Sequence, residues 1–296
     1  NGCANILDKE RSQQIDSLAV LTVMDKNILN INDCPFELAD SSLKKISQIY
    51  DNIDLMLLGY GGAGPYPQCV ENFEDSKKEK ESEKKRIKFL DMSKKFIKEI
   101  NPKFYLPFAG TYYLSGKLSK LQKFKGVPSI EDASQYLERN IAGKSQCLRL
   151  SPDSTLSLNN FETSDKYIPI NNSEIEEYLK NVLSKRKLSY ENEKEDSIEN
   201  IYDLAKKAHS RFLDKKKQFN LTLDTDVLIK LKNKFIHLDN SNDQINLKEL
   251  REIESINKYV IYDLDIRLLK NILSGPRFAH WNNAEIGSHI KFTRKP

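Results

Sequence analysis

The residues best suited to chemistry near the C-terminus lie close together in the chain. His280, Asn282, Asn283 and Glu285 fall within a short stretch, 280–289, that also holds the only tryptophan. Imidazole, carboxamide and carboxylate groups transfer protons, bind metals or donate hydrogen bonds to an oxyanion. We predict that these four residues form the catalytic part of a site, with a packed C-terminal plug as the alternative.

A second set of candidate residues follows short apolar runs in the first half of the chain. The runs 28–32, 53–58 and 104–106 have the composition of buried strands, and each ends in polar, glycine or proline residues. Asp33 follows the first run; at a buried strand end, a carboxylate either caps a turn or binds a cation, because a buried charge must be paired. We predict that these strand ends form one rim of a site, where Gly61, Gly62, Tyr66 and Tyr112 bind substrate. The alternatives are a tight turn for the glycines and half-buried core positions for the tyrosines.

The elements around this rim follow from apolar spacing. Segments 17–23 and 28–31 are expected to form a hairpin, and helices are expected at 41–50, capped by Asp40, and at 74–100 and 130–140. The order of strands and helices predicts a sheet covered by helices.

The second half of the chain shows a different pattern. Helical spacing occurs around 173–183 and 198–212, and the tail is expected to repeat a strand followed by a helix, at 219–223 with 226–231 and at 259–263 with 266–273. Turn residues cluster near 147–160. We therefore predict an α+β protein of two domains, 1–148 and 149–296.

Composition limits the class of protein. Of 296 residues 39% are hydrophobic and 30% charged, and 47 basic residues nearly balance 43 acidic ones without forming a basic stripe. We expect no nucleic-acid partner and no membrane span, and a cytoplasmic location. The four cysteines show no C-x-x-C spacing, so reduced thiols are expected, and the four histidines show no H-x-H spacing. Because the chain starts without a methionine, we expect it to be a fragment.

The residues of the rim carry a resemblance to a known family. The sequence has Asn-Asp-Cys-Pro at 32–35, Gly-Gly-Ala-Gly-Pro-Tyr-Pro at 61–67 and Leu-Pro-Phe-Ala-Gly-Thr-Tyr at 106–112. In this order they resemble the second half of the metallo-β-lactamase fold, in particular its CMP-N-acetylneuraminate hydroxylase branch, over residues 16–136 and in the 280–289 tail. The resemblance implies a four-layered αββα sandwich in which Asp33 bridges two metal ions.

The resemblance also implies a function. It predicts a metal-dependent hydrolase or oxygenase, acting on a polar, sugar-nucleotide-like small molecule and using a divalent metal, zinc or iron. The superfamily's H-x-H-x-D-H motif is absent from this chain, so an N-terminal segment or a second chain is expected to supply metal ligands. Ala109 stands where many members carry a histidine, and we predict that His280 and Glu285 replace it. The alternative is a non-catalytic binding or assembly module that keeps the fold without its metals.

Overall fold

The part of the chain that the structure describes has an α+β fold with two five-stranded sheets. The computed structural model describes residues 18–141 and 143–295. Contacts divide the chain into two compact units, and each unit is made of separate stretches. The first unit comprises Asn1–Gly62, Glu83–Tyr112 and Gly126–Ser173, and the second comprises Ala63–Ser82, Tyr113–Lys125 and Glu174–Pro296.

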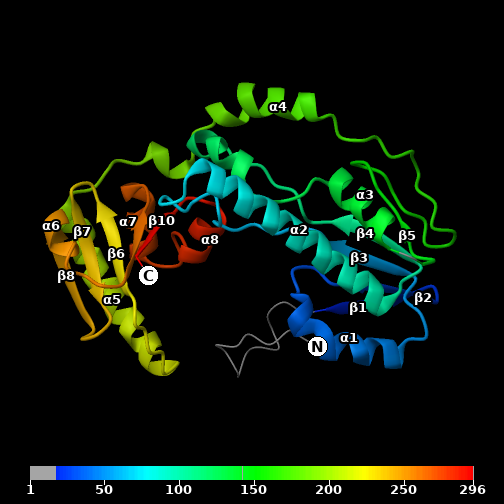
Figure 1. Cartoon of the computed structure of the whole chain (residues 1–296), viewed down its shortest axis with the longest axis horizontal. Helices are drawn as coiled ribbons and strands as arrows, with labels where there is room; N and C mark the ends of the chain where they lie inside the picture. Colours follow the sequence, from blue (N-terminus) through cyan, green and yellow to red (C-terminus); the bar gives the residue numbers. More distant parts are fainter. Residues whose placement is uncertain (1–17, 142, 296) are drawn as a thin grey trace. The chain divides into compact units, whose positions relative to one another are not determined.

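The sheet of the first unit has its strands side by side in chain order (Figure 1). They are β1 (Ala19–Val23), β2 (Lys26–Asn30), β3 (Leu55–Gly59), β4 (Phe104–Phe108) and β5 (Gln146–Cys147). The first two strands form the predicted antiparallel hairpin, and the other neighbours are parallel. Met24 and Asp25 at the hairpin turn both have positive φ, 51° and 61°, as tight two-residue hairpin turns require.

Helices connect the parallel strands. They are α1 (Phe36–Ile49), α2 (Asp75–Ile100) and α3 (Ile130–Asn140), and residues 83–100 of α2 belong to this unit. Helix α3 has the predicted bounds and begins with a capping box, in which the Ser129 hydroxyl accepts a hydrogen bond from the Asp132 backbone N–H. The predicted cap of α1 is wrong, because α1 begins five residues before position 41 and Asp40 lies inside the helix, paired with Lys44 at 2.8 Å.

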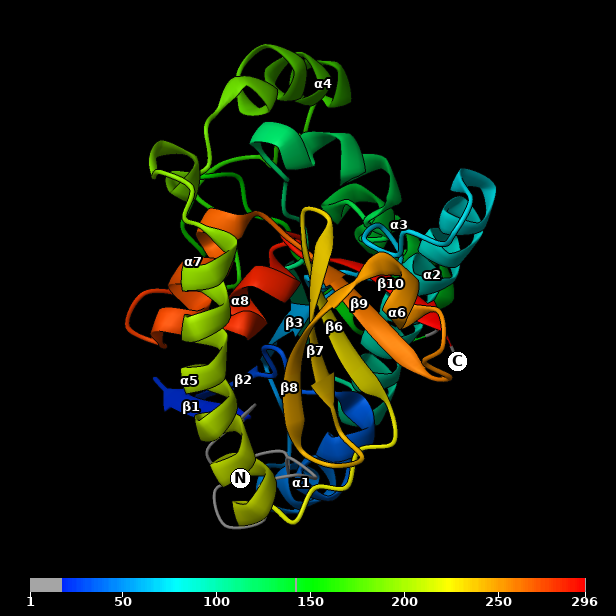
Figure 2. The ribbon, with the colours of Figure 1, turned by 90° about the vertical axis from the view of Figure 1, so that its left-hand side faces the viewer.

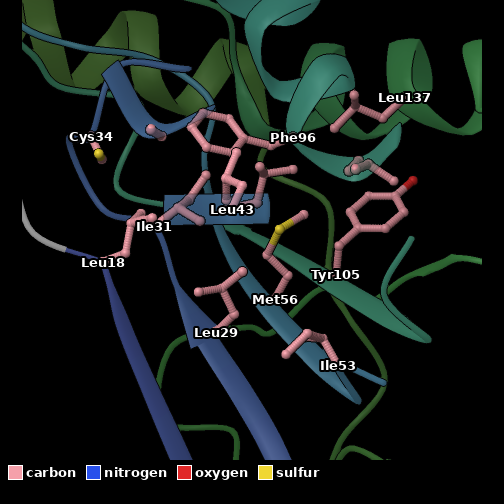
Figure 3. Close-up of a cluster of buried hydrophobic side chains, with 13 residues drawn as sticks. Leu18, Leu29, Ile31, Cys34, Leu43, Ile53, Met56, Phe96, Tyr105 and Leu137 are labelled. Atoms are coloured by element: carbon pink, nitrogen blue, oxygen red, sulfur yellow. The ribbon is translucent and has the colours of Figure 1, made fainter. Parts of the chain in front are cut away.

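The core of the first unit lies between the helices and one face of its sheet (Figure 3). Leu29, Met56 and Tyr105 are aligned on neighbouring strands, so their side chains share this face. Successive right-handed crossovers in one direction place every connecting helix on the same face. Leu43 of α1, Phe96 of α2 and Leu137 of α3 complete a core in which these side chains are at most 1% exposed.

The opposite face of this sheet is also apolar but less covered. Ile28, Leu57 and Leu106 are half-buried there, and Leu21 is 55% exposed. Phe161 covers part of this face by stacking on Phe104, with ring centroids 4.6 Å apart. The first unit is therefore a sheet with helices on one face and a partly exposed apolar surface on the other.

The sheet of the second unit has the order β10-β9-β6-β7-β8 (Figure 2). Its strands are β6 (Asp226–Leu231), β7 (Lys234–Asp239), β8 (Gln244–Glu249), β9 (Tyr259–Asp263) and β10 (Lys291–Lys295). Among the neighbouring strands described for this sheet, β6 and β9 are parallel and the other pairs are antiparallel. Helices α5 (Ile198–Gln218) and α7 (Ile266–Ser274) contribute Ile201, Ala205, Leu269 and Leu273 to a core against β6 and β7.

Two predictions for the tail are wrong and two are confirmed. Residues 226–231 are strand β6 rather than a helix, and 219–223 is not a strand. The apolar run 227–229 pairs with β7 across a tight turn. This pairing outweighs the short helical pattern of residues 226–231. Strand β9 has the predicted bounds, and α7 extends the predicted helix by one residue.

The remaining helices are short: α4 (Asn172–Asn181), α6 (Leu250–Ile253), α8 (Trp281–Ile286) and the 3-10 segments η2 (Gly116–Phe124), η3 (Leu183–Lys185) and η4 (Ser189–Asn192). Among the described residues, no helix has the length and apolar character needed to cross a membrane.

The two units are discontinuous, whereas the sequence prediction placed a single boundary after residue 148. Segment 63–82 joins the second unit through long-range contacts: Val70 forms a bridge with Phe292, and the Gln68 amide donates a hydrogen bond to the Ser288 hydroxyl at 3.1 Å. Sequence composition marks linkers between continuous domains, so it could not reveal such an exchange of segments.

The cysteines differ in state. Cys34 is disulfide-bonded, so the prediction of reduced thiols is wrong for this residue, whereas Cys69 and Cys147 are free. Cys3 and the other residues of 1–17 lie outside the described residues.

Candidate functional site

The carboxyl ends of β2, β3 and β4 lie at one edge of the first sheet. The three strands are parallel neighbours, so their ends meet there. The Ile31 N–H donates a hydrogen bond to the Leu57 carbonyl at 3.3 Å, and Gly59 pairs with Phe108. Asp33 lies two residues beyond Ile31. The structure thus brings together the three strand ends that the sequence predicted as one rim.

The glycine turns at this rim pack closely against each other. A Cβ at Gly61 would lie 2.9 Å from the Gly110 carbonyl oxygen and 2.8 Å from a methyl group of Val127. A Cβ at Gly110 would lie 2.3 Å from the ring of Tyr60, and one at Gly62 would lie 3.3 Å from the ring of Phe89. The nearest groups to Gly61 and Gly62 are therefore protein atoms, and substrate binding at these glycines stays a prediction.

Two residues of the rim have strained backbone. Ala109, after β4, has φ of 50°, and Asn32, after β2, has φ of 22°. An alanine in the left-handed region is uncommon, and such strain persists where the surrounding structure holds it, often at functional sites. Here Thr111 helps to hold the turn, because its hydroxyl donates to the Pro128 carbonyl at 2.9 Å and lies 3.1 Å from the Tyr60 hydroxyl. Burial raises the pKa of Tyr60, so its proton stays on the oxygen at neutral pH.

The two tyrosines predicted to bind substrate belong to different units. Tyr112 is half-buried in the first unit. Tyr66 belongs to the second unit, where its hydroxyl donates to Glu81 at 2.7 Å. Burial, together with Glu81, raises the pKa of Tyr66 to about 12. Tyr66 is thus a neutral hydrogen-bond donor to a carboxylate, and its contact with a substrate stays a prediction.

The predicted metal ligand is open to solvent. Asp33 is exposed and, within the described part of the chain, forms no hydrogen bond or ion pair. Across residues 18–141 and 143–295, no group of three or more histidine, cysteine, aspartate or glutamate side chains is arranged to hold a metal ion. Asp33 alone is too few ligands for a stable site, since protein metal sites use three or more donors.

The predicted C-terminal site residues lie on or beside a short helix. His280 is the residue before α8, and Asn282, Asn283 and Glu285 lie within it, so the segment is partly helical rather than a loop. His280, Asn282 and Asn283 are exposed, and Glu285 is half-buried. All four belong to the second unit and Asp33 to the first, so the prediction that they complete a site around Asp33 stays a prediction.

A cavity of about 370 Å³ in the second unit brings two of these residues together. His280 and Asn283 line it, whereas Asn282 and Glu285 are not among its lining residues. The cavity also includes His289 and Tyr190, which the sequence prediction did not choose. The His289 Nδ1 lies 3.1 Å from the Tyr190 hydroxyl, and the two rings meet edge to face. The pair is 99 positions apart in the chain, so no local pattern could have identified it.

The electrostatics of this pair keep both rings uncharged. Burial is the main cause that lowers the pKa of His289, and the nearby Lys117 lowers it further. Burial raises the pKa of Tyr190. Lys117 itself is paired with Asp265 at 2.6 Å and with Glu191 at 3.2 Å. At neutral pH the pair is therefore a neutral imidazole beside a neutral phenol.

No family model, curated protein or solved structure matches this chain. Its function must therefore be inferred from the geometry of the two regions just described.

Proposed function

We propose that the first unit is one half of a metallo-β-lactamase-type αββα sandwich and that the chain acts in a metal-dependent hydrolase or oxygenase. The substrate class proposed is a polar, sugar-nucleotide-like small molecule. The observation that carries the proposal is the position of Asp33, exposed at an edge that β2, β3 and β4 share. Sheet proteins place ligands at the carboxyl ends of parallel strands, where several chain segments converge.

The two faces of the first sheet support the sandwich. Helices α1, α2 and α3 contribute to the core on one face, whereas Ile28, Leu57 and Leu106 leave an apolar and half-buried surface on the other. In an αββα arrangement a second sheet packs on that surface, and apolar side chains that are buried between sheets stabilise the pair.

The described residues fit a metal only in part. Asp33 offers a carboxylate that no described side chain engages, which suits a hard or borderline cation such as zinc or iron. The other donors must come from elsewhere, and we propose an N-terminal segment or a second chain as their source. The described residues alone therefore do not complete a metal site.

The test is the metal content of the full-length protein and of two aspartate variants, measured by elemental mass spectrometry after purification without chelators. Asp33→Asn removes the carboxylate at the candidate rim. Asp51→Asn is the matched control, because Asp51 is also exposed but precedes β3, at the opposite edge of the sheet. We expect zinc or iron in the wild type, at about two ions per chain if the site is dinuclear. Asp33→Asn should lose metal, and Asp51→Asn should retain it.

A wild type without zinc or iron, or equal metal content in both variants, would contradict the proposal. That result would favour the second candidate, a binding or assembly module without metals. One observation supports this second candidate: the glycine turns of the rim are filled by Tyr60, Val127 and Phe89, as in a rim that serves packing rather than catalysis.

A further inference from the structure

The cavity in the second unit is built by segments that are distant in the chain. Its volume of about 370 Å³ lies in the range of small-molecule sites in proteins. Its lining includes Ser189, Tyr190, Leu268, Phe278, Asn283 and His289. These residues come from the η4 region, α7 and the segment around α8, and all lie within the second unit.

The lining has hydrogen-bonding groups but no fixed charge. The lining residues include no aspartate, glutamate, lysine or arginine. Lys117, which lies 4.9 Å from the centre of the Tyr190 ring, is already paired with two carboxylates. A charged ligand would find no oppositely charged side chain among the lining residues. The lining therefore favours an uncharged ligand.

The shape of the lining side chains favours a flat ligand. Phe278 is 65% exposed although it is a large apolar side chain, and it lines the cavity with the rings of His280 and His289. Exposed aromatic rings bind planar heterocycles by stacking, with little dependence on which heterocycle is bound. Asn283 adds a carboxamide, which both donates and accepts hydrogen bonds and so matches the edge of a heterocycle.

We propose that this cavity binds an uncharged planar heterocycle, of the size of a purine base, which stacks on Phe278 and forms hydrogen bonds with Asn283 and His289. Tyr190 positions His289, because it engages Nδ1. Any bond from this imidazole to the ligand then comes from Nε2. The site goes beyond the proposed metal-dependent function, since it uses neither Asp33 nor a metal.

The test is isothermal titration calorimetry of the full-length protein with adenosine, adenosine monophosphate and methyl glucoside, in the presence of a chelator. Adenosine supplies the uncharged planar ring, the monophosphate adds charge, and the glucoside is uncharged but not planar. We expect adenosine to bind and to bind more tightly than either other probe. Because the chelator removes any metal, the outcome is separate from that of the metal assay.

Single substitutions test whether adenosine binds in this cavity. Phe278→Ala should weaken adenosine binding about tenfold, since stacking on an aromatic ring makes a contribution of that order. Phe219→Ala is the matched control, because Phe219 is a 40% exposed phenylalanine of the same unit outside the cavity lining. Asn283→Ala, at an exposed position of α8, should also weaken binding.

Three results would overturn the proposal. They are the absence of adenosine binding at millimolar concentration, tighter binding of the monophosphate or the glucoside, and an equal affinity for adenosine in wild type, Phe278→Ala and Asn283→Ala.

Discussion

The two sheets of this protein place their candidate sites differently. In the first unit, three parallel strands end at one edge, and the candidate residues follow the strands directly. In the second unit, most neighbouring strands are antiparallel, and the candidate cavity lies among η4, α7 and α8 instead of at strand ends. Parallel strands gather their carboxyl ends on one edge, whereas antiparallel strands alternate their ends between both edges. Strand direction thus decides whether sequence order alone can bring polar residues together.

The inner strands of the two sheets also differ in the kind of side chain that they bury. The inner strands β3 and β4 of the first sheet present apolar side chains to the core. In the second sheet, His237 on β7 is only 4% exposed, and its Nε2 lies 2.8 Å from the Asp226 carboxylate. The first sheet should therefore be sensitive to steric changes, and the second to the loss of hydrogen-bond partners.

The largest effect is expected from Asp226→Ala in the second sheet. The carboxylate contacts His237 and also accepts a hydrogen bond from the Asn240 backbone N–H at 3.0 Å. Asp226→Ala leaves the His237 imidazole and the Asn240 N–H, which are both largely buried, without this hydrogen-bond partner. The free energy of unfolding should therefore fall by about 3 kcal/mol. Urea denaturation measures this loss.

The control for this change is Asp263→Ala, at an aspartate that pairs with Lys230 at 2.7 Å near the surface. An exposed pair contributes at most about 1 kcal/mol. Equal decreases in the free energy of unfolding for Asp226→Ala and Asp263→Ala would show that the stability of the second sheet does not depend on its buried polar pair.

A smaller effect is expected from Gly110→Ala at the rim of the first sheet. The added methyl group would lie 2.3 Å from the ring of Tyr60, which is only 4% exposed. Overpacking of this kind lowers the free energy of unfolding by about 2 kcal/mol. In Gly64→Ala, by contrast, the methyl group meets no atom within 4 Å, so thermal or urea unfolding should be almost unchanged. A tolerated Gly110→Ala would mean that the rim is not tightly packed.

The smallest effect concerns pH and His289. Burial lowers the pKa of His289 below its ordinary value of 6.5. Below pH 6.5 the unfolded chain then binds more protons at this residue than the folded chain does. The contribution of the neutral His289 to the stability of the folded state is therefore complete above pH 6.5. It is lost as the pH falls from 6.5 toward the lower pKa that His289 has in the folded state.

The measurement is urea unfolding at pH 7.5, 6.5 and 5.5 for the wild type and His289→Gln. The variant should lose less stability than the wild type over this range, by at most about 1 kcal/mol. Ser189→Ala, at a cavity residue that does not titrate, should keep the wild-type dependence. An identical dependence of the free energy of unfolding on pH for the wild type and His289→Gln would contradict a half-buried, neutral His289.

Local patterns in the sequence predicted much of the first unit. The alternation of short apolar runs with amphipathic segments predicted the β1–β2 hairpin, the strands β3 and β4, and the helices α2 and α3. These features depend on residues within a few positions of one another, as in the Ser129 cap of α3. The convergence of the ends of β2, β3 and β4 at one edge followed from the same patterns, because parallel strands align their ends.

Pairing between distant segments limited the prediction of the second unit. Segment 226–231 has apolar residues that suit either a short helix or a strand, and its pairing with β7 and β9 determines that it is a strand. The assignment of segment 63–82 to the second unit depends in the same way on contacts such as that between Gln68 and Ser288.

The sequence by itself determined the α+β class, the hairpin and helices of the first unit, and the presence of reactive residue types at 280–289. Only the tertiary structure decided that His289, rather than Glu285, shares a cavity with His280 and that Tyr190 engages its Nδ1. The physical reason is the separation along the chain over which each interaction acts. Backbone preferences and capping act over a few residues, whereas the 99 positions between Tyr190 and His289 are bridged only when the whole unit has folded.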